Sequence, residues 1–100
     1  MSVYLIIKSE TSLVDKKQFD NWYGHEHLKE AKKDFGAISA KRGWIANSDL
    51  HVAIYEFQSI KIAQKILKSK KLKLLIEKFD NKWNNKVNRT REIVDIIQEY

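Results

Sequence analysis

The chain has 100 residues with a formal net charge of +6 at pH 7, and 43% of its residues are hydrophobic. This length and apolar content argue against disorder and predict a single domain over residues 1–100, whose small core would gain from burial against a partner subunit. The chain has no cysteine, which excludes disulfide bonds and thiolate chemistry.

Apolar runs are short in this sequence, and none approaches the length of a membrane span. Lys8 and Glu10 interrupt the apolar amino-terminal segment too early for the hydrophobic region of a secretory signal. We therefore expect a cytoplasmic protein that has no membrane partner.

Residues 3–8 alternate and are rich in β-branched side chains, which predicts a first β-strand. Val3, Leu5 and Ile7 share one face of this strand, and Tyr4 and Ile6 share the other. Because both faces are apolar, we expect a sheet that is covered on both sides.

Residues 15–35 predict the first helix. Asp15 is suited to be its N-cap, with Gln18 three residues later, and Gly36 stands where a C-terminal glycine stop is expected. Gly24 lowers the helix propensity by about 1 kcal/mol relative to alanine, which tertiary packing or a close approach to the backbone would explain. At 3.6 residues per turn, one broad arc of the helix is apolar or aromatic and holds Phe19, Trp22, Tyr23, His27, Leu28 and Ala31.

His27 lies on the buried side of this helix, one turn after Tyr23 and three residues before Glu30. A histidine between an apolar wall and a carboxylate can transfer protons near neutral pH. The structural alternative is a half-buried histidine bonded to a backbone carbonyl. His25 falls on the polar side of the helix, and because the two histidines diverge, no metal site is expected.

The rest of the chain predicts a hairpin, more helix and a closing strand. The expected elements are strands over 37–46 and 50–57, a helix from Ser59, a further helical segment from Ser69 to Phe79, a loop over 80–86 and a strand over 87–97. The order β-α-β-β-α-β predicts an α+β, ferredoxin-like domain with helices on one face of an antiparallel sheet. The other face is too apolar for water, so we expect a homodimer in which two sheets pack face to face.

Three segments carry a resemblance to known proteins. They are FDNWYGHEHL over residues 19–28, FGAISAKRGW over 35–44 and VNRTREIVDIIQ over 87–98. The first resembles the F-x-x-W-Y-x-x-x-H-L segment of the dimeric α/β-barrel superfamily, in particular of its EthD-like and related monooxygenase-like or cyclase-like members. The other two are similar to the second strand and the closing strand of these proteins. Many EthD-like members have a proline after the histidine that His27 matches, and this chain has none.

The resemblance implies a homodimer of ferredoxin-like subunits that form a dimeric α/β barrel. Members of the superfamily carry out cofactor-free oxidation of polyaromatic compounds, polyketide cyclisation, lactone isomerisation and haem breakdown, and others only bind ligands. The fold therefore does not select a chemistry. No cofactor is expected, and haem is the least supported because no histidine has a clear axial-ligand setting.

The first functional hypothesis is a small enzyme that acts on an apolar, aromatic or polyketide-like molecule in a pocket between the first helix and the sheet. The candidate catalytic residues are His27 as acid or base, Tyr23, and Arg42, which would stabilise an enolate or oxyanion. The candidate ligand-binding residues are Trp22, Trp44, Tyr55, His51 and Arg91. Ordinary core packing is the alternative role for the aromatic residues, and we favour it for Phe19 and Phe57.

Arginines on a buried sheet face need a partner for their charge. The carboxylates considered for this role are Glu26, Glu30, Glu56 and Glu92, and structural salt bridges are the alternative to a catalytic use of the arginines.

Two other functions stay open. Nucleic acid is an unlikely partner, because lysines on an outer helix face are usually only solvated and no aromatic residues interleave with them. The lysines concerned are Lys61, Lys65, Lys68, Lys70, Lys71 and Lys73. The third hypothesis is a non-catalytic dimer that binds a metabolite or another protein.

Overall fold

The computed structural model describes residues 2–100, which form a four-stranded sheet and a layer of helices. The elements are β1 (Val3–Glu10), α1 (Lys16–Trp22), the π-helical turn η1 (Tyr23–His27), α2 (Leu28–Phe35), β2 (Ser39–Trp44), β3 (Leu50–Phe57), α3 (Ile60–Leu67), α4 (Lys70–Lys82) and β4 (Asn88–Asp95). The strand order is β2-β3-β1-β4, and all neighbouring strands are antiparallel. The predicted α+β, ferredoxin-like arrangement is confirmed.

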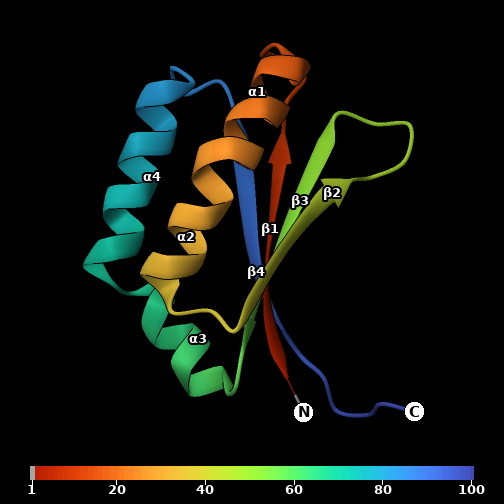
Figure 1. Ribbon diagram of the computed structural model, residues 1–100, viewed down its shortest axis with the longest axis vertical. Coiled ribbons are helices and arrows are strands. Elements are labelled where there is room, and N and C mark those ends of the chain that lie inside the picture. The colour runs from red at the N-terminus through yellow and green to blue at the C-terminus, as the bar shows by residue number, and fades with distance from the viewer. Residues whose placement is uncertain (1) are drawn as a thin grey trace.

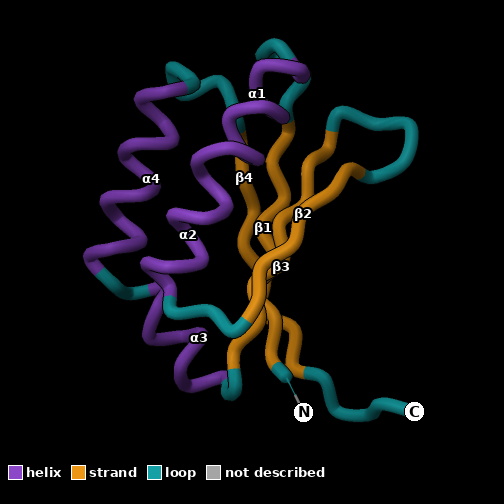
Figure 2. The backbone as a smooth tube through the Cα atoms, in the orientation of Figure 1, coloured by secondary structure: helices purple, strands orange, loops and turns teal. Residues whose placement is uncertain are grey.

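The helices form a single layer on one face of the sheet, with α4 beside α1 and α2 (Figure 1). The opposite face of the sheet carries no helix within residues 2–100 (Figure 2). Both ends of the described chain lie at the same end of the molecule, away from the β2–β3 loop. One broad sheet face is therefore left open.

The first helix begins and ends where the sequence predicts. The carboxylate of Asp15 accepts a hydrogen bond from the backbone N–H of Gln18 at 2.9 Å, which satisfies a free donor of the first turn. Gly36 takes a left-handed conformation with φ of 64°, which favours glycine at a helix C-terminus. Helical residues run without a break from 16 to 35, through η1.

The core lies between this helix layer and the inner face of the sheet. The inward residues of β1 and β3 are opposite one another, as in the pair Leu5 and Tyr55, and both are fully buried. Phe19 and Tyr23 of the first helix are buried against them. The alternation predicted for β1 and β3 is therefore confirmed, because one residue in two faces the helices.

The second helical segment is longer than the sequence predicts. Residues 80–82 belong to α4 and are not part of a loop. Leu72, Leu75, Phe79 and Trp83 are all buried, and their spacing of three and four residues carries the helix onward to Trp83. The helix then stops at two asparagines, Asn84 and Asn85, whose φ angles are 53° and 58°.

The open face of the sheet is apolar at its centre. It holds a shallow hollow of about 230 Å³ lined by Tyr4, Ile6, Lys41, Ile54, Val94 and Ile96. Val94 is 36% exposed, and with its apolar neighbours in this hollow it belongs to a contiguous patch, which is more informative than a single exposed side chain. No helix within residues 2–100 is long and apolar enough to cross a membrane.

Candidate functional site

The π-helical turn η1 lies at the centre of the first helix, between α1 and α2. In this turn the backbone N–H of Leu28 donates to the carbonyl of Tyr23, five residues earlier, in place of the usual four. Tyr23 and His27 both project into the core from the two ends of the turn, and they are 1% and 6% exposed. Because π turns occur often at functional sites, this pair is the natural starting point for a candidate site.

His27 is enclosed by aromatic rings. Its ring stacks on Trp22 with 4.7 Å between centroids, meets the edge of Tyr23 at 4.8 Å and lies 5.5 Å from Phe79 of α4. Its Nδ1 is buried and has no hydrogen-bond partner among residues 2–100. Burial, reinforced by the positive charge of Arg89, lowers the pKa of His27 to about 4. The imidazole is therefore neutral at pH 7.

Arg42 of β2 is the centre of a second group of polar side chains. Its Nη1 donates to Oδ1 of Asp20 in α1 at 2.8 Å and lies 3.3 Å from Nε2 of His51 in β3. The indole N–H of Trp44 donates to the same carboxylate oxygen of Asp20 at 2.9 Å. The hydrogen bonds from Arg42 and Trp44 lower the pKa of Asp20. One carboxylate of the first helix thus fixes two side chains of the edge strand β2.

The contact with Arg42 also settles which nitrogen of His51 carries the proton. A guanidinium can only donate, so Nε2 of His51 must be an acceptor and the proton is on Nδ1. Burial, with the nearby charge of Arg42, lowers the pKa of His51 to about 4. His51 is fully buried, and its ring centroid is 4.3 Å from that of Tyr23. A second neutral imidazole therefore adjoins the first site.

Two tyrosine hydroxyls meet beneath the helix. The Oη atoms of Tyr23 and Tyr55 are 3.3 Å apart, and both rings are buried. Burial raises the pKa of Tyr23 and, more strongly, that of Tyr55. Both phenols stay protonated near neutral pH, so each can donate a hydrogen bond but neither supplies a phenolate.

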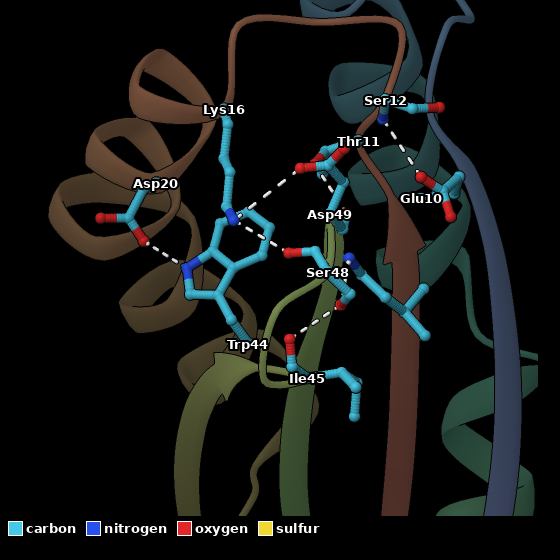
Figure 3. Close-up of polar contacts among 10 residues, drawn as sticks. Glu10, Thr11, Ser12, Lys16, Asp20, Trp44, Ile45, Ser48 and Asp49 are labelled. Carbon is cyan, nitrogen blue, oxygen red and sulfur yellow. Dashed lines mark hydrogen bonds and ion pairs between the residues drawn. The ribbon is translucent and has the colours of Figure 1, made fainter.

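The edge of this cluster reaches the surface beside the β2–β3 loop. Lys16 lies over the Trp44 ring at 4.6 Å and donates to the carbonyl of Ser48 at 2.9 Å, while Trp44 points to Asp20 (Figure 3). A hollow of about 340 Å³ opens here and is lined by Lys16, Lys17, Asp20 and Trp44. The polar cluster around Arg42 therefore borders solvent on one side.

Arg91 lies at the opposite edge of the sheet. It belongs to β4 and is paired with Ile7 of β1, whereas Arg42 belongs to β2. Three strand spacings separate β2 from β4, which is about 14 Å at the usual distance between strands. The structure thus brings together Tyr23, His27, His51, Tyr55, Trp22, Trp44 and Arg42. Arg91 is far from Arg42, but its charge acts on the pKa of Tyr23 from the β4 side of the cluster.

The carboxylates that partner the arginines are not the predicted ones. Arg42 pairs with Asp20, and Arg89 pairs with Asp80 at 2.8 Å. The glutamates face elsewhere: Glu26 and Glu30 pair with Lys78 of α4, Glu92 pairs with Lys8, and Glu56 accepts from Ser2 and Ser39. Alternation on the strands accounts for two of these errors, because Glu56 and Glu92 point to the open face, while the arginines point to the helices.

Phe79 and Arg89 also adjoin the candidate site, and neither was predicted to do so from the sequence. Phe79 of α4 touches His27, and the guanidinium carbon of Arg89 lies 3.7 Å from the centroid of the Phe79 ring. The signal for Phe79 was its helical spacing from Leu72 and Leu75, but no local pattern reveals that α4 packs beside the first helix. Among residues 2–100, no group of three or more His, Asp and Glu side chains is placed to hold a metal ion.

No protein-family model and no curated protein sequence matches the chain. Solved structures do match. An ethyl tert-butyl ether d (EthD) family protein from Bacillus halodurans is 22% identical with a TM-score of 0.75, over 97% of this chain and 100% of that one. SnoaB, a cofactor-independent oxygenase from Streptomyces nogalater, is 9% identical with a TM-score of 0.70, over 98% and 95%.

A dimeric ferredoxin-like protein from an uncultured marine organism is 11% identical with a TM-score of 0.59, over 100% of this chain and 98% of that one. At these identities the likeness is one of fold, and it extends over the whole chain. The chain therefore has the ferredoxin-like, EthD-like fold that its sequence motifs predict.

Proposed function

We propose that the protein is a homodimeric α/β barrel that binds a small apolar or aromatic molecule between its first helix and its sheet. The proposed activity is that of a cofactor-independent enzyme of the monooxygenase, cyclase or isomerase type, in which the step assigned to the protein is removal of a proton from the ligand; a monooxygenase would in addition need dioxygen as the oxidant. The observation that carries this proposal is His27, a neutral imidazole on a π-helical turn whose buried Nδ1 has no partner among residues 2–100. A buried polar atom without a partner costs stability, and a ligand that bonds to it would remove that cost.

The proposed catalytic roles follow from the protonation states. A neutral His27 accepts a proton from an acidic carbon or a phenol of the ligand. Tyr23 is protonated and donates a hydrogen bond, and Arg42 stabilises the negative charge that forms on oxygen. Arg42 can act without a large rearrangement, because its position is already held by Asp20.

The proposed binding surface consists mainly of aromatic rings. Trp22 and Trp44 would contact the flat faces of the ligand, while Tyr55 and His51 would form the floor, and Arg91 would hold its far end. His27 is only 6% exposed, so the aromatic side chains around it must move before a ligand can reach Nδ1. The hollow at Asp20 and Trp44 borders the Arg42 side of this cluster, and we propose that the ligand enters from there.

The homodimer is supported by the apolar open face of the sheet. Tyr4, Ile6 and Ile54 line this face, and a second copy packed sheet to sheet would cover them. A dimeric ferredoxin-like protein of the same fold supports this arrangement, and a cofactor-independent oxygenase of this fold supports the proposed chemistry. The cytoplasmic location stays a prediction from the sequence.

A non-catalytic ligand-binding or protein-binding dimer is the alternative. It is favoured by the engagement of Arg42, whose guanidinium already bonds to Asp20 and His51 and so has less capacity for an oxyanion. Nucleic acid remains the least supported partner, since the α3 and α4 lysines are exposed without interleaved aromatic side chains.

The test is proton exchange catalysed by the protein. One- to three-ring phenols and 1,3-diketones would first be screened by thermal shift, because a ligand that binds only the folded state raises Tm. Those that bind would be incubated in D₂O, and exchange of the acidic C–H for deuterium would be followed by NMR. We expect His27→Gln to lower the exchange rate at least 100-fold, within the usual range for general base catalysis.

His25→Gln is the matched control, because His25 is exposed on the same turn and bonds only to the carbonyl of Asn21. It should leave both binding and exchange unchanged. Binding without catalysed exchange, or exchange that survives His27→Gln, would leave the ligand-binding dimer as the function.

A further inference from the structure

A second hollow lies at the far edge of the sheet, where the end of α4 meets the start of β4. Its volume is about 310 Å³, at the lower end of the range for small-molecule sites. Its lining residues are Ile76, Asp80, Asn85, Val87, Asn88, Arg89 and Arg91. Polar and charged side chains therefore dominate this hollow, in contrast to the aromatic cluster around His27.

The two arginines of the hollow differ in their partners. Arg89 pairs with Asp80 at 2.8 Å and lies over the Phe79 ring, so its charge is already compensated. Arg91 is partly buried, forms no ion pair with the rest of the described chain, and its buried Nε has no hydrogen-bond partner there. Asp80 is the carboxylate whose charge acts on Arg91, but its Oδ1 is already bonded to Arg89, so Arg91 is left with an unmet donor at Nε and suits a ligand that brings a negative charge.

The charge count of the hollow indicates a monoanion. Two arginines and one aspartate leave a single net positive charge, which one carboxylate neutralises and a phosphate dianion would exceed. The planar guanidinium of Arg91 also matches the two oxygens of a carboxylate. Asn85 and Asn88 also line the hollow and offer side-chain amide donors, and the backbone of Asn85 is left-handed with φ of 58°.

We infer that this hollow is a carboxylate-binding site in which Arg91 pairs with the carboxylate of a small organic acid. Ile76 and Val87 provide apolar contacts for the rest of that molecule. The site adjoins the candidate catalytic residue, because the Phe79 ring contacts both Arg89 of the hollow and His27. Binding of an acid at Arg91 does not depend on the proposed function. The further step, that this acid is the substrate of His27, does rest on it, and the substrate would then be an apolar or aromatic molecule that carries a carboxylate.

The experiment compares three probes of similar shape by calorimetric titration at low salt: benzoate, neutral benzamide and phenyl phosphate. We expect benzoate to bind at least tenfold more tightly than benzamide and no more weakly than phenyl phosphate. Arg91→Gln should weaken benzoate binding at least tenfold. Lys65→Gln makes the same charge change on the exposed face of α3 and should alter the affinity less than twofold.

The amide signals of Asn85 and Asn88 in wild-type NMR spectra provide a measurement that does not depend on a variant, and benzoate should shift both. Equal binding of benzoate and benzamide, unchanged binding by Arg91→Gln, or unmoved asparagine signals would each overturn the inference. Preferred binding of phenyl phosphate would overturn the assignment to a carboxylate. Benzoate binding and catalysed deuterium exchange are measured separately, so failure of the anion site and failure of proton transfer at His27 are distinguished.

Discussion

The backbone of Gly24 and the guanidinium of Arg42 are in direct contact across the interface between the first helix and the sheet. A Cβ atom placed on Gly24 would lie 2.6 Å from Nη2 of Arg42, closer than real Cβ contacts allow. The glycine in the middle of the helix, which disfavours helix formation, is thus explained by the space that Arg42 needs. With Nη2 against Gly24, the Nη1 of Arg42 contacts Asp20 and His51.

We expect Gly24→Ala to displace Arg42 while changing the overall stability little. The alanine should favour the helix by about 1 kcal/mol, and the loss of the Arg42 contacts should offset that gain. The displacement is measured as a rise in the pKa of Asp20, because hydrogen bonding from Arg42 is the largest cause that lowers it. Carboxyl NMR titration of the two proteins reports this change.

Gly43→Ala is the matched control for this prediction. A Cβ on Gly43 meets no atom within 4 Å, so the pKa of Asp20 should not move. If the pKa of Asp20 were unchanged in Gly24→Ala, the position of Arg42 would not require a glycine at residue 24.

The two buried histidines predict a loss of stability in mildly acidic solution. The pKa of each is about 4 in the folded protein, below the ordinary value of 6.5 that applies to the unfolded chain. Between these values the unfolded chain binds more protons, so the free energy of unfolding falls as the pH is lowered from about 6.5 toward 4. Each histidine contributes a slope of up to about 1.4 kcal/mol per pH unit in that window, and almost none above pH 7.

Urea denaturation between pH 7.5 and 4.5 measures this slope. His27→Gln should remove about half of the slope, whereas His25→Gln, at an exposed position, should leave it unchanged. Wild-type stability that is constant from pH 6.5 to 4.5 would show that the two imidazoles take up protons as easily in the folded protein as in water.

The sequence predicts the fold well because its local signals agree with one another. Asp15 and Gly36 mark the ends of the first helix, and alternation in β1 and β3 separates the inner face of the sheet from the open face. Each of these signals depends on residues a few positions apart. The extension of α4 to Lys82 is the exception, since the asparagines and aspartate of that stretch are more typical of a loop.

The candidate site is less predictable, because its contacts join distant segments. The partner of Arg42 is Asp20, 22 positions away, and the partner of Arg89 is Asp80 on another element. Helical spacing places His27 on the buried side, but the π turn and the Phe79 ring that enclose it come from the tertiary structure. The sequence therefore predicts which residues belong to the candidate site, but it does not predict which of them contact one another.

The last prediction concerns the open face of the sheet and follows from the proposed dimer. Ile54 lies at the centre of that face, among Tyr4, Ile6 and Val94. We expect Ile54→Lys to convert the dimer to a folded monomer, because two copies would bring a pair of unpartnered cations into the buried interface. Analytical ultracentrifugation over the micromolar range measures the change, which should be an increase in the dimer Kd of at least 100-fold.

Ile62→Lys makes the same substitution on the outer side of α3, where the side chain is 42% exposed, and should leave the dimer intact. Wild-type protein that sediments as a monomer throughout this range would remove the dimer from the proposal, and an Ile54→Lys protein that stays dimeric would place the interface on another surface.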